Sequence, residues 1–248
     1  MIFRAIACSA IVAIAGSAAV GQSPTVDEIV AKSLAAKGGE EKLRAVTSVK
    51  MTGRVKGPTG DMPFTSWAKR PNKMRRENIT DGQTFVLAFD GMTVWRINPL
   101  TSTVPQEITG PQAEKTRQDA GDFDTPLLDY KARGTRVELV GTEAVQGITM
   151  HRLRLTWKNG TIQEVYLNAD TYLESRTVMQ VEQGKGKAIV TAEFSNYKQV
   201  DGITVPFHVR QLHNGRLMVE VTYDSYEFNA PTADSLFEMP DKELGAGS

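Results

Sequence analysis

Apolar residues recur every third or fourth position only near the start of the chain, which is typical of an amphipathic helix. Thr25 followed by Glu28 matches the capping box that begins a helix, and Gly38 with Gly39 can end it. The positions that share the apolar face are Val26, Ile29, Val30 and Leu34. We therefore expect a helix from Thr25 to these glycines, and a second short helix over Glu40–Val46.

From Thr47 onward the apolar pattern has a period of two, which indicates β-strands with one buried and one solvated face. Asn-Gly or Asp-Gly pairs at 81–82, 90–91, 159–160, 201–202 and 214–215 favour tight hairpin turns. Neighbouring strands should therefore pair antiparallel, since the long helical crossovers of parallel sheets are missing. The predicted strands are Ser48–Lys56, Met62–Lys69, Lys73–Thr80, Thr84–Phe89, Thr93–Asn98, Thr135–Gly141, Ile148–Trp157, Thr161–Asn168, Tyr172–Glu182, Lys187–Gln199, Thr204–His213 and Arg216–Phe228.

The segment Pro111–Tyr130 interrupts this alternation. It contains two stretches with helical features, Pro111–Gln118 and Asp124–Tyr130, the second with Pro126 in its first turn. We expect a helical insertion that covers or plugs one open side of the sheet.

The start of the chain has the features of a secretory signal peptide. Arg4 precedes an apolar run over 5–15, which is shorter than the roughly 20 residues that span a bilayer. We expect cleavage after Ala19 or Gly21, so that residues 1–21 form the signal. A short uncleaved anchor is the alternative.

Composition narrows the functional classes for the remaining 22–248, which we expect to form a single domain. Cys8 is the only cysteine and lies in the predicted signal, so a mature chain has neither disulfides nor a thiol nucleophile. The 29 basic and 29 acidic residues balance, which argues against nucleic acid as a partner.

Motifs for catalysis and metal binding are not found. His151, His208 and His213 lack the spacing of a metal site, and no nucleophile elbow or phosphate loop occurs. Asp119, Asp122 and Asp124 do not follow the order of a calcium loop. The sequence therefore predicts no catalytic residue, metal or cofactor.

Two features indicate binding. Methionines, which fill irregular apolar space, accompany the strands at 51, 62, 74, 92, 150, 179 and 218 and suit either an acyl-chain site or an ordinary core. A basic group straddles the turn at Pro71 and could meet an anionic headgroup or a partner protein, or form the wet face of a hairpin. Its members are Lys69, Arg70, Lys73, Arg75 and Arg76.

Several segments resemble the outer-membrane lipoprotein-sorting proteins, the family of LolA and LolB. The N-terminal segment of these proteins is similar to Lys37–Val46 and the following Val49–Gly53. Their strand-and-turn, hairpin and C-terminal segments are similar to Glu164–Tyr172, Phe194–Pro206 and Asp234–Pro240. The similarity extends over the whole mature chain, and its motifs are turns and caps.

This resemblance implies a mainly β protein with helices, an unclosed antiparallel β-barrel of about eleven strands with short helices as a lid over the concave face. It implies a monomeric periplasmic carrier or binding protein whose cargo is a lipid or the acyl chains of a lipoprotein. The residues expected to bind lipid, chosen by alternation, are Met62, Phe64, Phe85, Leu87, Phe89, Leu153, Leu155 and Trp157. The lid residues are Pro111, Pro126, Leu127 and Leu128.

The sequence is also compatible with two other functions. One is an envelope sensor or protein-interaction module with the same fold but without transport, whose partner would be another envelope protein. The other is an envelope enzyme, which would need polar groups that converge in the trough, and alternation places few there.

Overall fold

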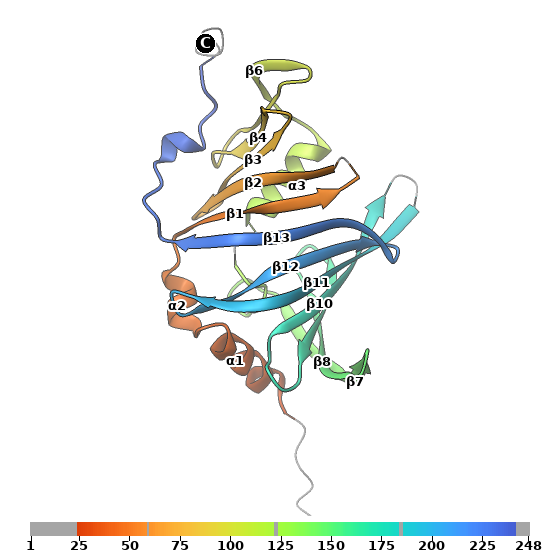
Figure 1. The fold of residues 1–248 in the computed structure, drawn as a ribbon. Coiled ribbons are helices and arrows are strands. Elements are labelled where there is room, and N and C mark those ends of the chain that lie inside the picture. Colours follow the sequence, from red (N-terminus) through yellow and green to blue (C-terminus); the bar gives the residue numbers. More distant parts are fainter. Residues whose placement is uncertain (1–23, 59, 122–123, 184–185, 242–248) are drawn as a thin grey trace, which may run out of the picture.

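The computed structural model describes residues 24–58, 60–121, 124–183 and 186–241, so the predicted signal peptide lies outside the described residues. One antiparallel sheet of 13 strands dominates the fold, in the order β6-β5-β4-β3-β2-β1-β13-β12-β11-β10-β9-β8-β7 (Figure 1). The strands are β1 (Ser48–Gly57), β2 (Gly60–Lys69), β3 (Lys73–Thr80), β4 (Gln83–Phe89), β5 (Val94–Asn98), β6 (Ser102–Glu107), β7 (Arg136–Val145), β8 (Ile148–Thr156), β9 (Ile162–Asn168), β10 (Glu174–Gln183), β11 (Gly186–Val200), β12 (Ile203–His213) and β13 (Arg216–Phe228). The helices are α1 (Val26–Ala36), α2 (Glu40–Ala45), α3 (Pro111–Gly121) and the short 3-10 helix η1 (Asp234–Leu236).

The first and last strands pair in the middle of the sheet. Val49 of β1 lies opposite Phe228 of β13, while β6 and β7 form the two edges. Among the described residues no pairing joins these edges, so the sheet is open. The predicted open antiparallel architecture, mainly β with short helices, is confirmed.

The sheet has one strand that the alternation did not predict. β6 is a short edge strand whose residues are mostly exposed and which contains Pro105. Proline is tolerated at an edge because its missing N–H breaks no ladder there. An exposed strand of this kind needs no apolar face, so it leaves no periodic signal.

The predicted hairpin turns form with different geometries. Asp81-Gly82, Asp201-Gly202 and Asn214-Gly215 have positive φ at both residues, as a type I′ turn requires. At 90–91 and 159–160 only the glycine has positive φ. Gln146-Gly147 also has positive φ at both positions and joins β7 to β8 without the usual Asn or Asp.

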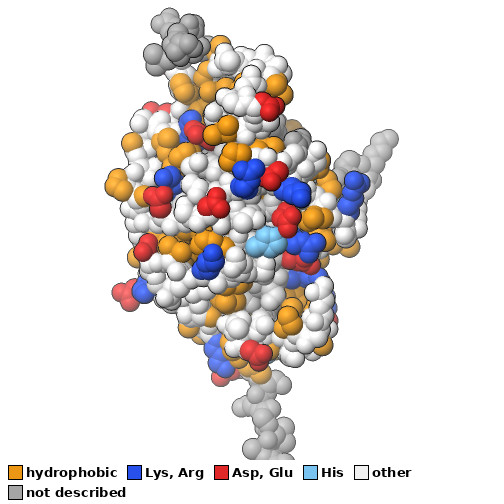
Figure 2. Space-filling model, viewed as in Figure 1, with side chains coloured by type: hydrophobic (Ala, Val, Ile, Leu, Met, Phe, Trp, Pro, Cys, Tyr) orange, Lys and Arg blue, Asp and Glu red, His pale blue; other side chains and the backbone are white. Residues whose placement is uncertain are grey.

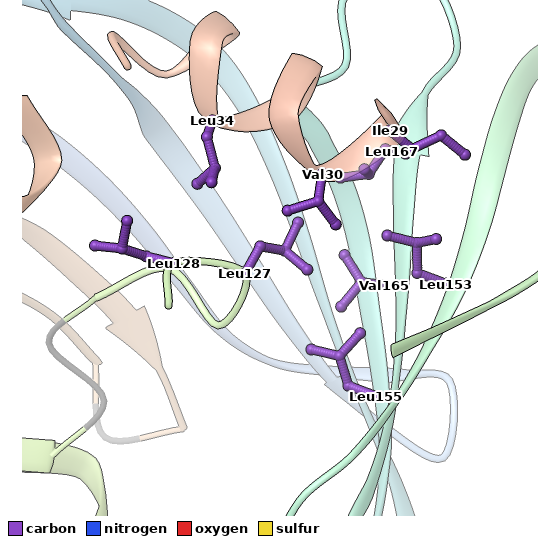
Figure 3. Packing of buried hydrophobic residues seen from close by; sticks show 9 residues of the cluster. All are labelled: Ile29, Val30, Leu34, Leu127, Leu128, Leu153, Leu155, Val165 and Leu167. Carbon is purple, nitrogen blue, oxygen red and sulfur yellow. The ribbon is translucent and has the colours of Figure 1, made fainter. Parts of the chain in front are cut away.

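The two longer helices cover the same face of the sheet, here called the inner face. Thr25 and Glu28 form the predicted capping box of α1. α1 packs Ile29, Val30 and Leu34 against β8 and β9, as Figure 3 shows. The side chains that complete this core are Leu127, Leu128, Leu153, Leu155, Val165 and Leu167.

α3 covers the inner face at the other half of the sheet, over β3–β5. Its Ala113 and Ala120 pack with Phe89 and Val94, and these small side chains let the helix lie close to the strands. The helix predicted over Asp124–Tyr130 is wrong, because residues 126–130 form successive turns.

The outer face carries a separate core and a network of charges. Trp95 is fully buried and donates a hydrogen bond from Nε1 to the carbonyl of Phe237, which fixes the C-terminal segment over β4 and β5. Across β10–β13, basic and acidic side chains alternate, as the mixed colours of Figure 2 show. The alternating residues are Arg176, Glu193, Arg210 and Glu220.

Candidate functional site

A cavity of about 520 Å³ lies between the inner face and the elements that cover it. Its sheet side comes from β1, β2, β3, β11, β12 and β13, the strands at the middle of the fold. The apolar side chains on this side include Val49, Met51, Ala68, Met74, Phe194, Ile203, Val205, Tyr226 and Phe228. The pairing of β1 with β13 places Val49 beside Phe228 and Met51 beside Tyr226, so chain ends distant in sequence form one apolar surface.

The covering side of the cavity is built from helix ends and turns. Leu43 of α2 and Asp119 and Ala120 of α3 contribute, together with Pro126 and Leu128 from the turns that follow α3. The covering elements therefore touch the same space as the strands.

Polar residues with ion pairs lie at one part of the cavity wall, here called its polar end. Nζ of Lys37 lies 2.6 Å from Oε1 of Glu174, and Thr125 Oγ1 donates a hydrogen bond to the same oxygen. Asp124, whose side chain is 8% exposed, accepts hydrogen bonds from the guanidinium groups of Arg70 and Arg133. Three basic side chains thus share two carboxylates at this end, and these ion pairs tie the segment after α3 to the sheet.

Two tyrosines on the cavity wall use their hydroxyl groups to fix the backbone. Tyr197 donates to the carbonyl of Glu174 at 2.7 Å and Tyr226 to the carbonyl of Pro206 at 2.8 Å. Burial raises the pKa of both phenols well above the usual value, so both remain neutral. They therefore add aromatic surface to the cavity without adding charge.

The eight residues predicted to bind lipid do not line this cavity. Leu153 and Leu155 are fully buried in the core beneath α1, and Phe89 is buried beneath α3. The others are spread over the strand ends and the inner face of β2–β4: Met62, Phe64, Phe85, Leu87 and Trp157. Their role in binding stays a prediction.

The predicted lid residues divide into two groups. Pro126 and Leu128 line the cavity, whereas Leu127 is buried in the core under α1 and Pro111 begins α3. The alternating pattern did not identify Val49, Tyr226 and Phe228 as cavity residues. Only the pairing of β1 with β13 shows that they lie side by side.

The predicted basic group does not form one patch. Lys69 and Lys73 pair with Asp234, Arg70 pairs with Asp124, and Arg75 pairs with Glu77. Arg76 is the exception, because no ion pair joins it to any described residue.

The histidines occupy different surroundings. His151 is 8% exposed beside Tyr172, and burial lowers the pKa of its imidazole. His208 lies between Ser195 and Glu220, at 3.0 and 2.9 Å, on the outer face among the alternating charges. Within the described ranges no three His, Cys, Asp or Glu side chains gather as a metal site. None of the described helices is long and apolar enough to cross a membrane.

Comparison with solved structures finds proteins of similar fold. No family model and no curated protein matches the sequence. A DUF1329 family protein from Desulfovibrio piger superposes with a TM-score of 0.59 at 14% identity, covering 87% of this chain and 98% of that one. A LolA superfamily protein from Nitrosomonas europaea gives a TM-score of 0.57 at 12% identity, with coverage of 87% and 98%.

A third structure comes from Vibrio parahaemolyticus and is described as an outer membrane lipoprotein-sorting protein domain. Its TM-score is 0.54 at 17% identity, covering 88% of this chain and 97% of that one. These identities are too low to transfer a function, but the agreement extends over nearly the whole of each neighbour. The chain therefore has the LolA-like fold that its sequence motifs predicted.

Proposed function

We propose that this protein binds acyl chains of a lipid or lipoprotein in the cavity beneath α2 and α3, and carries them in the bacterial periplasm. The observation that carries this proposal is an apolar cavity of about 520 Å³ under a cover of helix ends and turns. This volume is within the usual range of about 300–1,000 Å³ for small-molecule sites. Each methylene buried there contributes about 0.8 kcal/mol, so one chain supplies enough free energy for stable binding.

The arrangement of polar groups favours binding over catalysis. At the polar end Lys37 pairs with Glu174 and Arg70 pairs with Asp124, and the wall tyrosines are held neutral by burial. A hydrolytic enzyme would need a nucleophile beside a base in this space. Ser195 and His208 do form such a contact, but on the outer face, away from the cavity.

Export through the predicted signal at 1–21 would place the protein in the periplasm. Transport from one envelope component to another is the finer part of the proposal. A sensor or interaction module with the same cavity is the second candidate, and it would recognise an envelope protein rather than deliver cargo.

The decisive experiment compares bound lipid in three proteins purified without detergent. Val205→Trp fills the cavity from its wall, and Val140→Trp places the same bulk on β7, where Val140 is 43% exposed. Mass spectrometry of organic extracts should find acyl lipid in the wild type and in V140W, and much less in V205W. Equal thermal stability of the two variants would show that folding is not the cause.

An empty wild-type cavity that also fails to bind an added fluorescent fatty acid would overturn the proposal. Equal retention by V205W and V140W would place the lipid elsewhere. Periplasmic fractionation of the full chain tests the location independently.

A further inference from the structure

Two arginines on the inner face have no ion-pair partner among the described residues. The Nε atoms of Arg76 and Arg96 are buried and make no hydrogen bond within the described residues. No ion pair joins either guanidinium to any residue in the described ranges. Both residues are half-buried, and a charge that is partly withdrawn from water without a partner destabilises a fold.

The strand register places these arginines in one row. Arg76 of β3 lies opposite Leu87 of β4, and Leu87 lies opposite Arg96 of β5. All three side chains point to the inner face, because directly paired residues share a face of the sheet. Two strand spacings separate the arginine backbones by about 10 Å, so their long side chains can reach one small group between them.

The surroundings of Arg76 are apolar. Its guanidinium lies 5.0 Å from the centre of the Phe64 ring, and Tyr223 stands against the same ring at 5.7 Å. Burial lowers the pKa of Arg76. The group nevertheless stays protonated at neutral pH, since arginine is not deprotonated in proteins.

Acidic side chains close by are already engaged. Glu77, the next residue on β3, pairs with Arg75 on the outer face. On α3, which covers this part of the sheet, Asp119 pairs with Lys115 and Glu114 pairs with Arg117. Of the described carboxylates, Glu77, Asp119 and Glu114 therefore have other partners, and the two arginines keep their positive charges.

The row borders the cavity. Ser66 and Met74 line the cavity, Ser66 is the cross-strand partner of Arg76, and Met74 lies two residues before it on the same strand. A molecule whose chain occupies the cavity can therefore extend a head group over β3 toward β5.

We propose that Arg76 and Arg96 bind the anionic head, a phosphate or carboxylate, of an amphiphile whose acyl chain fills the cavity. This inference rests on the proposed function and narrows the ligand class from any acyl chain to anionic amphiphiles. Guanidinium groups suit the role because they donate paired hydrogen bonds to such oxygens. The alternative that the basic residues near Pro71 form a solvated hairpin face does not hold for Arg76, because this side chain points to the covered side of the sheet.

Binding of dodecyl phosphate, dodecanol and inorganic phosphate tests the proposal by titration of intrinsic fluorescence. The wild type should bind dodecyl phosphate at least about tenfold more tightly than dodecanol, since a charged hydrogen bond contributes about 1.5–3 kcal/mol. Arg76→Gln with Arg96→Gln should remove most of this preference and leave dodecanol binding unchanged. Arg216→Gln, which removes an exposed charge from the start of β13, should keep this preference.

A thermal melt separates ligand binding from a structural role. Because Arg76 has no ion pair with any residue that the structure describes, R76Q should keep or raise the melting temperature of the ligand-free protein, whereas loss of a structural arginine would lower it. A preference that survives in the double variant overturns the inference. Binding of inorganic phosphate as tight as that of dodecyl phosphate also overturns it, by assigning the site to a free anion. If neither amphiphile binds, the proposed function itself fails.

Discussion

Lys37 and Glu174 form an ion pair in which each side chain is only about one-tenth exposed, with 11% and 10% of its surface open. Removing one member of such a pair leaves the other charge buried without compensation. Lys37→Met should therefore lower the free energy of unfolding by about 3 kcal/mol. Urea denaturation measures the loss.

The matched control is Lys50→Met. Lys50 pairs with Glu227 at 2.9 Å, but the two side chains are 34% and 48% exposed. An exposed pair contributes about 0–1 kcal/mol, so this variant should unfold close to the wild type. Equal losses in the two variants would show that burial of the Lys37 pair has no energetic consequence.

His151 makes stability depend on pH. Burial, with a smaller effect of Lys32, lowers the pKa of His151 below its usual value. The unfolded chain then binds a proton more readily than the folded one, so this contribution is fully present above about pH 6.5 and is lost as the pH falls through the folded pKa.

Denaturation of His151→Gln between pH 7.5 and pH 5 tests this dependence. The wild type should lose more stability over this interval than the variant, since the variant has no proton to bind at this site. His208→Gln serves as the control on the outer face and should keep the slope due to His151. Parallel slopes in the wild type and in H151Q would contradict the expectation.

At the scale of elements, α3 depends on small side chains. Ala113 is fully buried against β4 and β5, and Ala120 is 4% exposed. Ala113→Leu has no room and should lower the free energy of unfolding by about 1–3 kcal/mol, the usual effect of overpacking. Glu114→Leu adds similar bulk on an exposed position and should change stability little. Chemical denaturation measures the difference, and we expect a lower midpoint for A113L than for E114L.

The elements that sequence could predict are those determined by local chemistry. The α1 capping box and the Asp81-Gly82, Asp201-Gly202 and Asn214-Gly215 turns need only neighbouring residues, and they formed as expected. The helix expected over Asp124–Tyr130 did not form. Asp124 and Thr125, which could have capped it, instead bind Arg70 of the β2–β3 turn and Glu174 of β10.

At the scale of the whole molecule, the cavity could not be located by alternation. Alternation assigns a face within each strand, but which faces enclose free space depends on the strand order and on where helices pack. Leu153 and Leu155 point to the inner face, as the alternation indicates, but α1 fills the space above them. Val49 and Phe228, by contrast, lie where no helix core reaches, and only long-range pairing reveals this.

The cover of the cavity is joined to the sheet by Asp124. This carboxylate accepts from Arg70, which also donates to the carbonyls of Val46 and Leu43 at the end of α2. Arg133 donates to the same carboxylate, at Oδ2, over 2.6 Å. One side chain thus connects the segment after α3, the end of α2 and the β2–β3 turn.

If this segment must move for an acyl chain to leave, weakening its attachment should speed release. Asp124→Asn removes the charge that holds both guanidinium groups, while Asp129→Asn removes an exposed carboxylate that pairs with Arg44. Stopped-flow measurement of a bound fluorescent fatty acid should show release several-fold faster in D124N and unchanged in D129N. An unchanged rate in D124N despite lower stability would mean that the segment only supports the fold, and that ligands leave between the strands and α3 instead.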